Sequence, residues 1–180
     1  EEEALRTADR IILPGVGAFG DAAAKLRALR LDALLRELAG QGKPLMGICL
    51  GMQLLFDKSY EYGEHTGLGL IPGEVRPLAP VLAPGAKVPH MGWNSLHLNR
   101  PDDPLLSGVR EGDFVYYVHS FYATGCGEAL AASSEHGGVT VAGAVRRGCV
   151  CGTQFHPEKS GAVGLRILRA FAMGEGDAAC

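Results

Sequence analysis

The stretch GKPLMGICLGMQLLFD, residues 42 to 57, places one cysteine between two glycines, with an apolar run before it and an amphipathic run after it. The apolar run is typical of a buried strand, and the second run has apolar residues at helical spacing. A cysteine at such a strand-to-helix turn has the geometry of a nucleophile elbow, in which small flanking residues permit a tight turn. We therefore expect the Cys49 thiol to be raised into a cleft.

The chemistry expected of Cys49 follows from this position. The start of a helix favours an anion, so the turn is expected to lower the pKa of the thiol. The helix leaves the backbone N–H of Leu50 unpaired, and this group can donate to a developing oxyanion. These features predict an acyl-transfer nucleophile. The alternative is a buried structural cysteine beside two packing glycines, Gly47 and Gly51.

A cysteine nucleophile needs a base, and one of the six histidines has a suitable context. In GTQFHPEKS, His156 ends an expected strand and is followed by a proline that constrains the backbone and then by Glu158. A carboxylate can orient an imidazole that takes and returns a proton. The sequence therefore predicts a triad of Cys49, His156 and Glu158.

The rest of the chain shows strands alternating with helices and then a series of short strands. DRIILPGVG (9–17) predicts a strand, residues 21–40 a helix and residues 43–49 a second strand, a pattern of parallel βα units. From residue 69 onward, short strands separated by Gly/Pro turns lead to a last helix at 162–174. We predict one α/β domain over residues 1–180. Its mixed, mainly parallel central sheet is flanked by helices, with the site at the carboxyl ends of the strands.

Composition excludes several classes of function. A net charge of −3 and scattered basic residues argue against a nucleic-acid surface. The apolar stretches fall short of the ~20 residues needed to cross a bilayer, and the acidic start is unlike a signal peptide. Five cysteines form an odd set, which favours reduced thiols and a cytoplasmic location. Cys149 and Cys151 lack a second ligand pair at zinc-like spacing, so we expect no metal or other cofactor.

Two motifs carry a resemblance to a known family. The elbow Gly47-Ile48-Cys49-Leu50-Gly51-Met52-Gln53 and the late His156-Pro157-Glu158 resemble those of class I (triad) glutamine amidotransferases, and the similarity extends over nearly the whole chain. It implies a flavodoxin-like core and a glutaminase that converts glutamine to glutamate and ammonia through a cysteine thioester. The resemblance also implies substrate contacts from Gly15, Gly51, Gln53 and the backbone of Ser120 and Phe121.

Two further segments resemble those of family members that supply ammonia to a cyclase subunit. In LPGVGAFGDA (13–22), the turn resembles the loop whose Val16 N–H is the second oxyanion donor, although such a turn is also an ordinary βα connection. PHMGWN (89–94) resembles a segment at the partner face, and this implies that Trp93, Asn94 and Lys159 contact the cyclase in a heterodimer. A turn with a core tryptophan is the alternative. The resemblance further implies a tunnel for ammonia.

Other interpretations stay open at this point. The chain could be the glutaminase of another synthase, such as the one that makes pyridoxal phosphate, although PHMGWN speaks against it. It could also be a non-catalytic α/β interaction subunit, although the intact triad speaks against that. The family pattern opens with a strand carrying an Asp-Tyr-x-x-Gly-Asn-type motif and a helix that the sequence does not contain, so one side of the sheet is expected to be uncovered. No role is assigned to Cys180.

Overall fold

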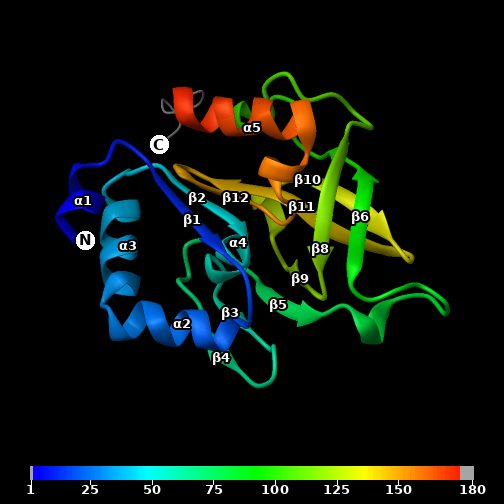
Figure 1. Ribbon diagram of the computed structural model, residues 1–180, viewed down its shortest axis with the longest axis horizontal. Coiled ribbons are helices and arrows are strands. Elements are labelled where there is room, and N and C mark those ends of the chain that lie inside the picture. The colour runs from blue at the N-terminus through cyan, green and yellow to red at the C-terminus, as the bar shows by residue number, and fades with distance from the viewer. Residues whose placement is uncertain (1, 175–180) are drawn as a thin grey trace.

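The computed structural model describes residues 2–174, in which helices cover both faces of a six-stranded mixed sheet (Figure 1). Its strands are hydrogen-bonded in the order β1 (Ile11–Gly15), β2 (Leu45–Cys49), β12 (Val150–Thr153), β11 (Val139–Arg147), β10 (Leu130–His136) and β7 (His97–Leu98). β2 is parallel to both of its neighbours, β1 and β12. The remaining pairings in this sheet are antiparallel.

Two smaller sheets extend from this central one. The first contains, in spatial order, β4 (His65–Thr66), β3 (Lys58–Ser59), β5 (Glu74–Pro77) and β9 (Phe121–Thr124). The second is an antiparallel pair of β6 (His90–Ser95) and β8 (Phe114–His119). β8 ends and β9 begins on either side of Ser120, so the two small sheets meet at this residue.

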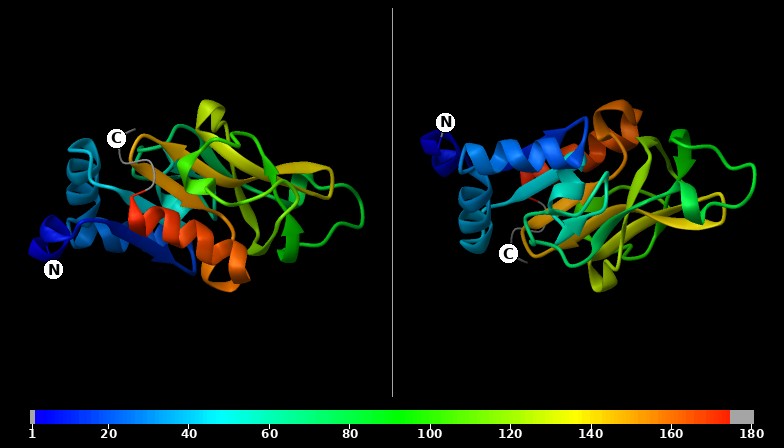
Figure 2. Two further views of the ribbon diagram at one scale, coloured as in Figure 1. Left: turned by 90° about the horizontal axis from the view of Figure 1, so that it is seen from above. Right: turned by 90° about the horizontal axis from the view of Figure 1, so that it is seen from below.

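The helices lie on opposite sides of the central sheet. The α-helices are α1 (Glu2–Thr7), α2 (Phe19–Ala28), α3 (Leu31–Gly40), α4 (Leu50–Leu54) and α5 (Gly161–Met173). The short 3-10 helices are η1 (Ala79–Val81), η2 (Pro104–Leu106), η3 (Gly127–Ala129) and η4 (Pro157–Lys159). Figure 2 shows α5 on one side of the sheet and α2 with α3 on the other.

Alternating side chains of β2 explain why both faces need helices. Leu45 packs in the cluster that contains the α3 leucines, whereas Met46 packs in the cluster that contains Ile167 and Phe171 of α5. All residues of β2 are buried, as expected of a central parallel strand covered on both sides. The apolar run before Cys49 is therefore the centre of the fold.

The predicted mixed α/β fold is confirmed, with two differences in detail. In the central sheet, parallel pairing is confined to β1, β2 and β12, because β10, β11 and β12 follow one another through short turns and pair antiparallel. In the neighbouring sheet, β3 and β5 also pair parallel. The helix expected over residues 21–40 is divided into α2 and α3 at Arg30, which adopts a left-handed conformation with φ 57°.

The N-terminal side of the sheet was only partly predicted. β1 lies at the edge of the described sheet, and Ile12 is 47% exposed. The short helix α1 precedes β1, although no helix was expected there. Its Arg6 is joined to Glu37 of α3 by a 2.7 Å ion pair, which ties α1 to the rest of the chain.

The cysteines differ in their state. Cys49, Cys126 and Cys151 are free and buried, as expected. Cys149 is disulfide-bonded, so the expectation of reduced thiols is wrong at that position. Cys180 lies outside the described residues. None of the helices between residues 2 and 174 combines the length and the apolar character that a bilayer crossing requires.

Candidate active site

The Cys49 turn has the backbone geometry of an elbow. Cys49 is the last residue of β2, and α4 begins at the next residue. Its φ of 54° and ψ of −110° lie in a region that residues with a side chain rarely adopt. Such a conformation costs about 1–3 kcal/mol and persists only where the surrounding structure holds it. The buried strand and helix on either side of Cys49 provide that support.

Three glycines make this turn possible by allowing close packing. A Cβ at Gly51 would stand 1.7 Å from the Leu13 carbonyl oxygen of β1, and a Cβ at Gly47 would stand 2.5 Å from the Gly51 oxygen. A Cβ at Gly15 would stand 3.1 Å from the Leu50 Cβ. α4 therefore crosses β1 and β2 at a distance that only glycine tolerates. Gly47 and Gly51 therefore act as packing glycines, as the alternative of a structural cysteine expected. The same close packing also forms the elbow.

The Cys49 sulfur contacts two groups that the sequence did not suggest. Gln154 donates from Nε2 to Sγ at 3.7 Å, and Sγ lies 4.0 Å from the Val118 carbonyl oxygen. Burial raises the pKa of the thiol, the Leu50 N–H lowers it, Glu158 raises it, and Gln154 and Lys159 lower it. The predicted lowering of this pKa is thus wrong, because burial has the largest effect on the thiol.

His156 and Glu158 form the predicted pair. Nδ1 of His156 lies 2.7 Å from Oε1 of Glu158, and the histidine side chain is 7% exposed while that of the glutamate is 48% exposed. Ser160 fixes the segment, since its hydroxyl accepts from the Tyr116 N–H at 2.9 Å and donates to the His156 carbonyl oxygen at 2.7 Å. The Glu158 carboxylate holds the imidazole from one side and leaves Nε2 for the cavity.

Cys49 and His156 line one cavity of about 340 Å³. Within residues 2–174 no hydrogen bond joins the two side chains, since the thiol lies against Val118 and Gln154. The lining consists of Val16, Gly17, Cys49, Leu50, Gln53, Glu61, Tyr62, Val118, His119, Ser120, Phe121 and His156. Of the residues predicted for catalysis, the oxyanion and the substrate, Gly15, Gly51 and Glu158 are not part of this lining. The glycines lie behind it, and Glu158 acts through His156.

Two functional candidates were missed. Gln154 is fully buried and joins Gln53 to the Cys49 sulfur, accepting from Gln53 Nε2 at 3.0 Å. Its position could have been noticed in the sequence, because it is a polar residue at the end of an expected buried strand, two residues before His156. Glu61 is also buried and lines the cavity, and its Oε2 accepts from the Phe19 N–H at 2.8 Å. It lies in EYGEH, a loop without a recognisable pattern.

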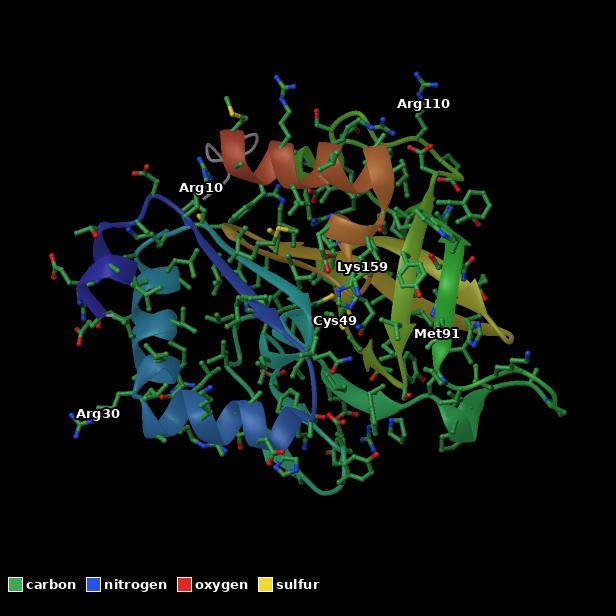
Figure 3. All side chains as sticks on the ribbon, in the orientation of Figure 1. Arg10, Arg30, Cys49, Met91, Arg110 and Lys159 are labelled. Atoms are coloured by element: carbon green, nitrogen blue, oxygen red, sulfur yellow. The ribbon has the colours of Figure 1, made fainter. Side chains whose placement is uncertain are left out.

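The predicted partner residues lie on two segments. On the outer face of β6 and β8, Met91, Trp93 and Phe114 are each more than half exposed. Figure 3 labels Lys159, Met91 and Cys49 in one view. Lys159 directly follows the triad glutamate in the sequence. Lys159 is exposed. Asn94 is half buried, and its amide donates to the Glu135 carbonyl oxygen at 2.9 Å.

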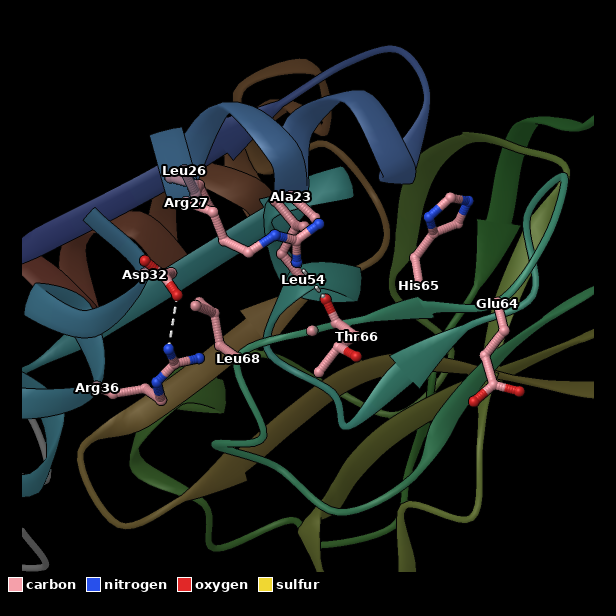
Figure 4. Close-up of a pocket in the computed structure, with 11 residues that line it drawn as sticks. Ala23, Leu26, Arg27, Asp32, Arg36, Leu54, Glu64, His65, Thr66 and Leu68 are labelled. Carbon is pink, nitrogen blue, oxygen red and sulfur yellow. Dashed lines mark hydrogen bonds and ion pairs between the residues drawn. The ribbon is translucent and has the colours of Figure 1, made fainter. Parts of the chain in front are cut away.

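A second hollow, of about 450 Å³, lies between α2 and β4 and holds none of the predicted site residues (Figure 4). Leu26, Leu54 and Leu68 contribute apolar surface to it, and Arg27 donates to the Thr66 carbonyl oxygen at 3.3 Å. The thiol, imidazole and amide groups described above are therefore gathered in the smaller cavity.

Comparison with known proteins agrees with this geometry. The model of the family "Glutamine amidotransferase class-I" matches residues 1–174. The imidazole glycerol phosphate synthase subunit HisH of Wolinella succinogenes is 49% identical over 172 residues, which are 95% of this chain and 83% of the relative. The HisH subunit of Geobacillus kaustophilus is 53% identical over 174 residues, 95% of this chain and 81% of the relative.

Solved structures share the fold at lower identity. A glutamine amidotransferase crystal structure has a TM-score of 0.69 at 20% identity, with 96% of this chain and 84% of the other covered. The glutaminase domain of Trypanosoma brucei CTPS with bound acivicin has a TM-score of 0.63 at 18% identity, with 96% and 74% covered. The sequence relatives are HisH subunits, which argues against the glutaminase of pyridoxal phosphate synthase and against a non-catalytic subunit. The chain therefore belongs to the class-I glutamine amidotransferases, in the family of the HisH subunits of imidazole glycerol phosphate synthase.

Proposed function

We propose that this glutamine amidotransferase hydrolyses glutamine by the attack of Cys49 Sγ on the side-chain amide carbon. His156 takes the thiol proton through Nε2 and gives it to the departing nitrogen, so that ammonia leaves and a γ-glutamyl thioester forms. Water then attacks the thioester, and glutamate is released with the free thiol. The observation that carries the proposal is the strained elbow that brings Cys49 into one cavity with the His156–Glu158 pair.

Backbone donors stabilise the two tetrahedral intermediates. The Leu50 N–H lowers the pKa of the Cys49 thiol, and Leu50 lines the cavity, so this N–H is the first donor in the proposal. Val16 and Gly17 line the other side of the cavity, and Gly17 has a φ of 96° that a residue with a side chain rarely adopts. In this proposal the Val16 N–H is the second donor. Loss of one such donor typically lowers kcat by about 100–1,000-fold.

Polar groups of the cavity suit an amino-acid substrate. Glu61 places a buried carboxylate in the lining, which complements an α-ammonium group. Gln53 uses its amide nitrogen within the protein, and its Oε1 has no hydrogen-bond partner among residues 2–174, so this oxygen is available to the substrate. The segment at Ser120 and Phe121 borders the same space.

The ammonia product implies an acceptor subunit. The relatives are named as subunits of imidazole glycerol phosphate synthase, and we extend this to the chain as a heterodimer with the cyclase subunit in histidine biosynthesis. The exposed surface of Met91, Trp93 and Phe114, with Lys159 beside the triad, suits a protein interface, since aromatic residues and Met are enriched in interface cores. A cytoplasmic location belongs to this proposal, because the catalytic thiol must stay reduced.

The test is glutamate formation by the chain alone, with the cyclase, and with the cyclase and its acceptor ligand. We expect the isolated chain to be nearly silent and the liganded complex to be active, because release of ammonia without an acceptor wastes glutamine. Cys49→Ala should abolish turnover, and Cys126→Ala should retain it. A Lys159→Ala variant measured in each condition should lower the activation by the partner. Full-rate turnover by the chain alone, indifferent to cyclase and ligand, contradicts the gated function.

A further inference from the structure

A continuous path of hydrogen bonds runs from strand β6 to the Cys49 sulfur. It begins with the Asn94 amide, 3.1 Å from His90 Nε2, and continues from His90 Nδ1 to His119 Nε2 at 2.9 Å. His119 Nδ1 lies 2.8 Å from the Phe121 carbonyl oxygen. His90 and His119 are paired across β6 and β8, so the register of this sheet brings the two rings together.

The direction of each bond follows from the Asn94 amide. Its Oδ1 accepts from the Ser95 N–H at 2.8 Å, and its Nδ2 donates to the Glu135 carbonyl oxygen at 2.9 Å. Nδ2 must therefore also donate to His90, whose Nε2 is an acceptor. The single proton of a neutral His90 ring is then on Nδ1.

The same reasoning passes to the second ring. His90 Nδ1–H donates to His119 Nε2, so His119 also carries its proton on Nδ1 and donates it to the Phe121 carbonyl oxygen. Every nitrogen of both rings has a partner in this assignment. The opposite tautomer of either ring would place two donors against each other at one of these contacts.

Packing keeps the rings in place and neutral. His90 is stacked between Tyr117, at 4.4 Å between ring centroids, and His136, at 4.2 Å. Burial, together with the nearby His119 and His136, lowers the pKa of His90 to about 3. Burial also lowers the pKa of His119 to about 4, where the Phe121 carbonyl raises it and His136 and His156 lower it. Both rings are thus neutral at neutral pH.

The path reaches the substrate cavity at Phe121. Its carbonyl oxygen accepts from His119 and also from Gln53 Nε2 at 3.0 Å. Gln53 Nε2 donates in turn to Gln154 Oε1, and Gln154 Nε2 donates to the Cys49 sulfur. The orientation of Gln53, and hence of the oxygen that faces the cavity, depends on a carbonyl that His119 holds.

We propose that His90 and His119 are positioning residues for glutamine, each held in the Nδ1–H tautomer, which connect strand β6 to Gln53 through the Phe121 carbonyl. This inference rests on the proposed glutaminase function. It gives the two histidines no proton-transfer role, which belongs to His156. β6 presents Met91 and Trp93 outward and His90 inward, so the path also connects the exposed partner surface with the cavity.

A metal site is the competing explanation for clustered histidines. Within residues 2–174 no group of three or more His, Cys, Asp or Glu side chains is arranged to hold a metal ion. His90 and His136 stack with their planes only 21° apart, so their nitrogens do not converge on one point. The ring nitrogens of His90 and His119 are used in the hydrogen bonds described above, and Nε2 of His136 lies 2.9 Å from the Lys87 carbonyl oxygen.

The first test measures the tautomers by two-dimensional ¹H–¹⁵N NMR of the imidazole nitrogens in the full chain. We expect Nδ1–H signals for His90 and His119 that stay unchanged between pH 5 and pH 8. An Nε2–H tautomer of either ring at pH 7 would overturn the proposed path. This measurement needs no turnover, so its result is independent of whether the chain hydrolyses glutamine.

The second test is steady-state kinetics of the complex with cyclase and acceptor ligand. His119→Phe removes both bonds and should raise KM for glutamine about five- to tenfold, with a smaller change in kcat, because it loosens ground-state positioning. His119→Asn retains a donor near the Nδ1 position and should recover part of the loss. The matched control, His97→Phe, alters an exposed histidine and should leave KM unchanged.

The outcomes separate the two hypotheses. If the wild-type complex releases no glutamate, the glutaminase proposal fails, whatever the tautomers are. If the wild-type complex is active and the folded His119→Phe variant keeps its KM, the positioning role is wrong. If His119→Phe does not fold, His90→Phe, which removes the donor toward His119 Nε2, should also raise KM for glutamine, and an unchanged KM in that folded variant would overturn the positioning role.

Discussion

Gly51 of α4 faces the carbonyl of Leu13 so closely that no side chain fits between helix and strand. We expect Gly51→Ala to lower the free energy of unfolding by more than about 3 kcal/mol, because the backbone of β1 or α4 must move to admit a methyl group. Urea denaturation followed by circular dichroism measures the change. Gly40→Ala is the control, since a Cβ at Gly40 meets nothing within 4 Å. Equal stability of the two variants would contradict the packing argument.

Selective labelling tests the nucleophile. A glutamine-like electrophile should modify Cys49 and leave Cys126 and Cys151 unmodified, because only Cys49 lies in the substrate cavity. Burial raises the pKa of all three thiols, so the feature that distinguishes Cys49 is the presence of His156 in the same cavity. Peptide mapping by mass spectrometry identifies the modified residue. Labelling that continues in a folded Cys49→Ala variant would refute the assignment.

The two partners of the cysteine should differ in their effect on rate. His156→Ala removes the proton carrier and should lower kcat by about 100- to 10,000-fold. Glu158→Gln keeps a group near Nδ1 but removes the charge that stabilises the imidazolium, so a measurable residual rate is expected. Both rates are measured in the assembled complex at saturating glutamine. A Glu158→Gln variant with wild-type kcat would show that Glu158 does not orient the histidine.

The buried histidines predict a loss of stability in acid. The pKa of His90 falls from 6.5 to about 3 on folding and that of His119 from 6.5 to about 4, so below pH 6.5 the unfolded chain binds protons that the folded chain does not. Stability is therefore unaffected by these groups above pH 6.5 and decreases as the pH falls from 6.5 toward 4. The slope is up to about 1.4 kcal/mol per pH unit for each histidine.

Urea denaturation at a series of pH values measures this slope. In a folded His119→Phe variant, the free energy of unfolding should decrease less steeply between pH 6 and pH 4.5 than in the wild type. The difference should correspond to the uptake of about one proton fewer on unfolding. A wild-type protein whose stability is constant over that range, or a variant with the wild-type slope, would show that the rings are not held neutral.

Docking of the cyclase should depend on the exposed β6 surface. Trp93→Ala removes a large side chain that is 57% exposed in the free chain, and we expect the Kd for the cyclase to rise at least about 30-fold, as for a central aromatic contact. Leu165→Ala on α5 is the control, because Leu165 is 64% exposed and belongs to another element. Isothermal titration calorimetry gives both values. Equal effects would indicate that docking uses another face.

Local spacing explains what could be predicted. The elbow and the His156–Glu158 pair each lie within a few residues of sequence, so their geometry follows from one turn. The strand and helix on either side of Cys49 were likewise visible as apolar periodicity. Fold class followed from the same signals, because a strand buried on both faces requires helices on each side.

Non-local pairing explains what could not be predicted. His90 meets His119 only through the register of β6 against β8, and Glu61 meets Phe19 across 42 positions of the chain. The pKa of Cys49 depends on how deeply the sulfur is buried, which no short motif records. Arg30 ends one helix and starts another by adopting a left-handed conformation that its residue type does not favour.

Glu61 serves two regions with one carboxylate. It lines the glutamine cavity, and it accepts a hydrogen bond from the first N–H of α2 at Phe19. The turn with Val16 and Gly17 is thus anchored by β1 at one end and by Glu61 at the other. In the proposed glutaminase, the same carboxylate therefore holds the substrate ammonium and the start of α2, since a carboxylate accepts several hydrogen bonds at once. The proposed substrate contact and one end of the proposed oxyanion turn thus depend on a single side chain, so a substitution at Glu61 acts on both.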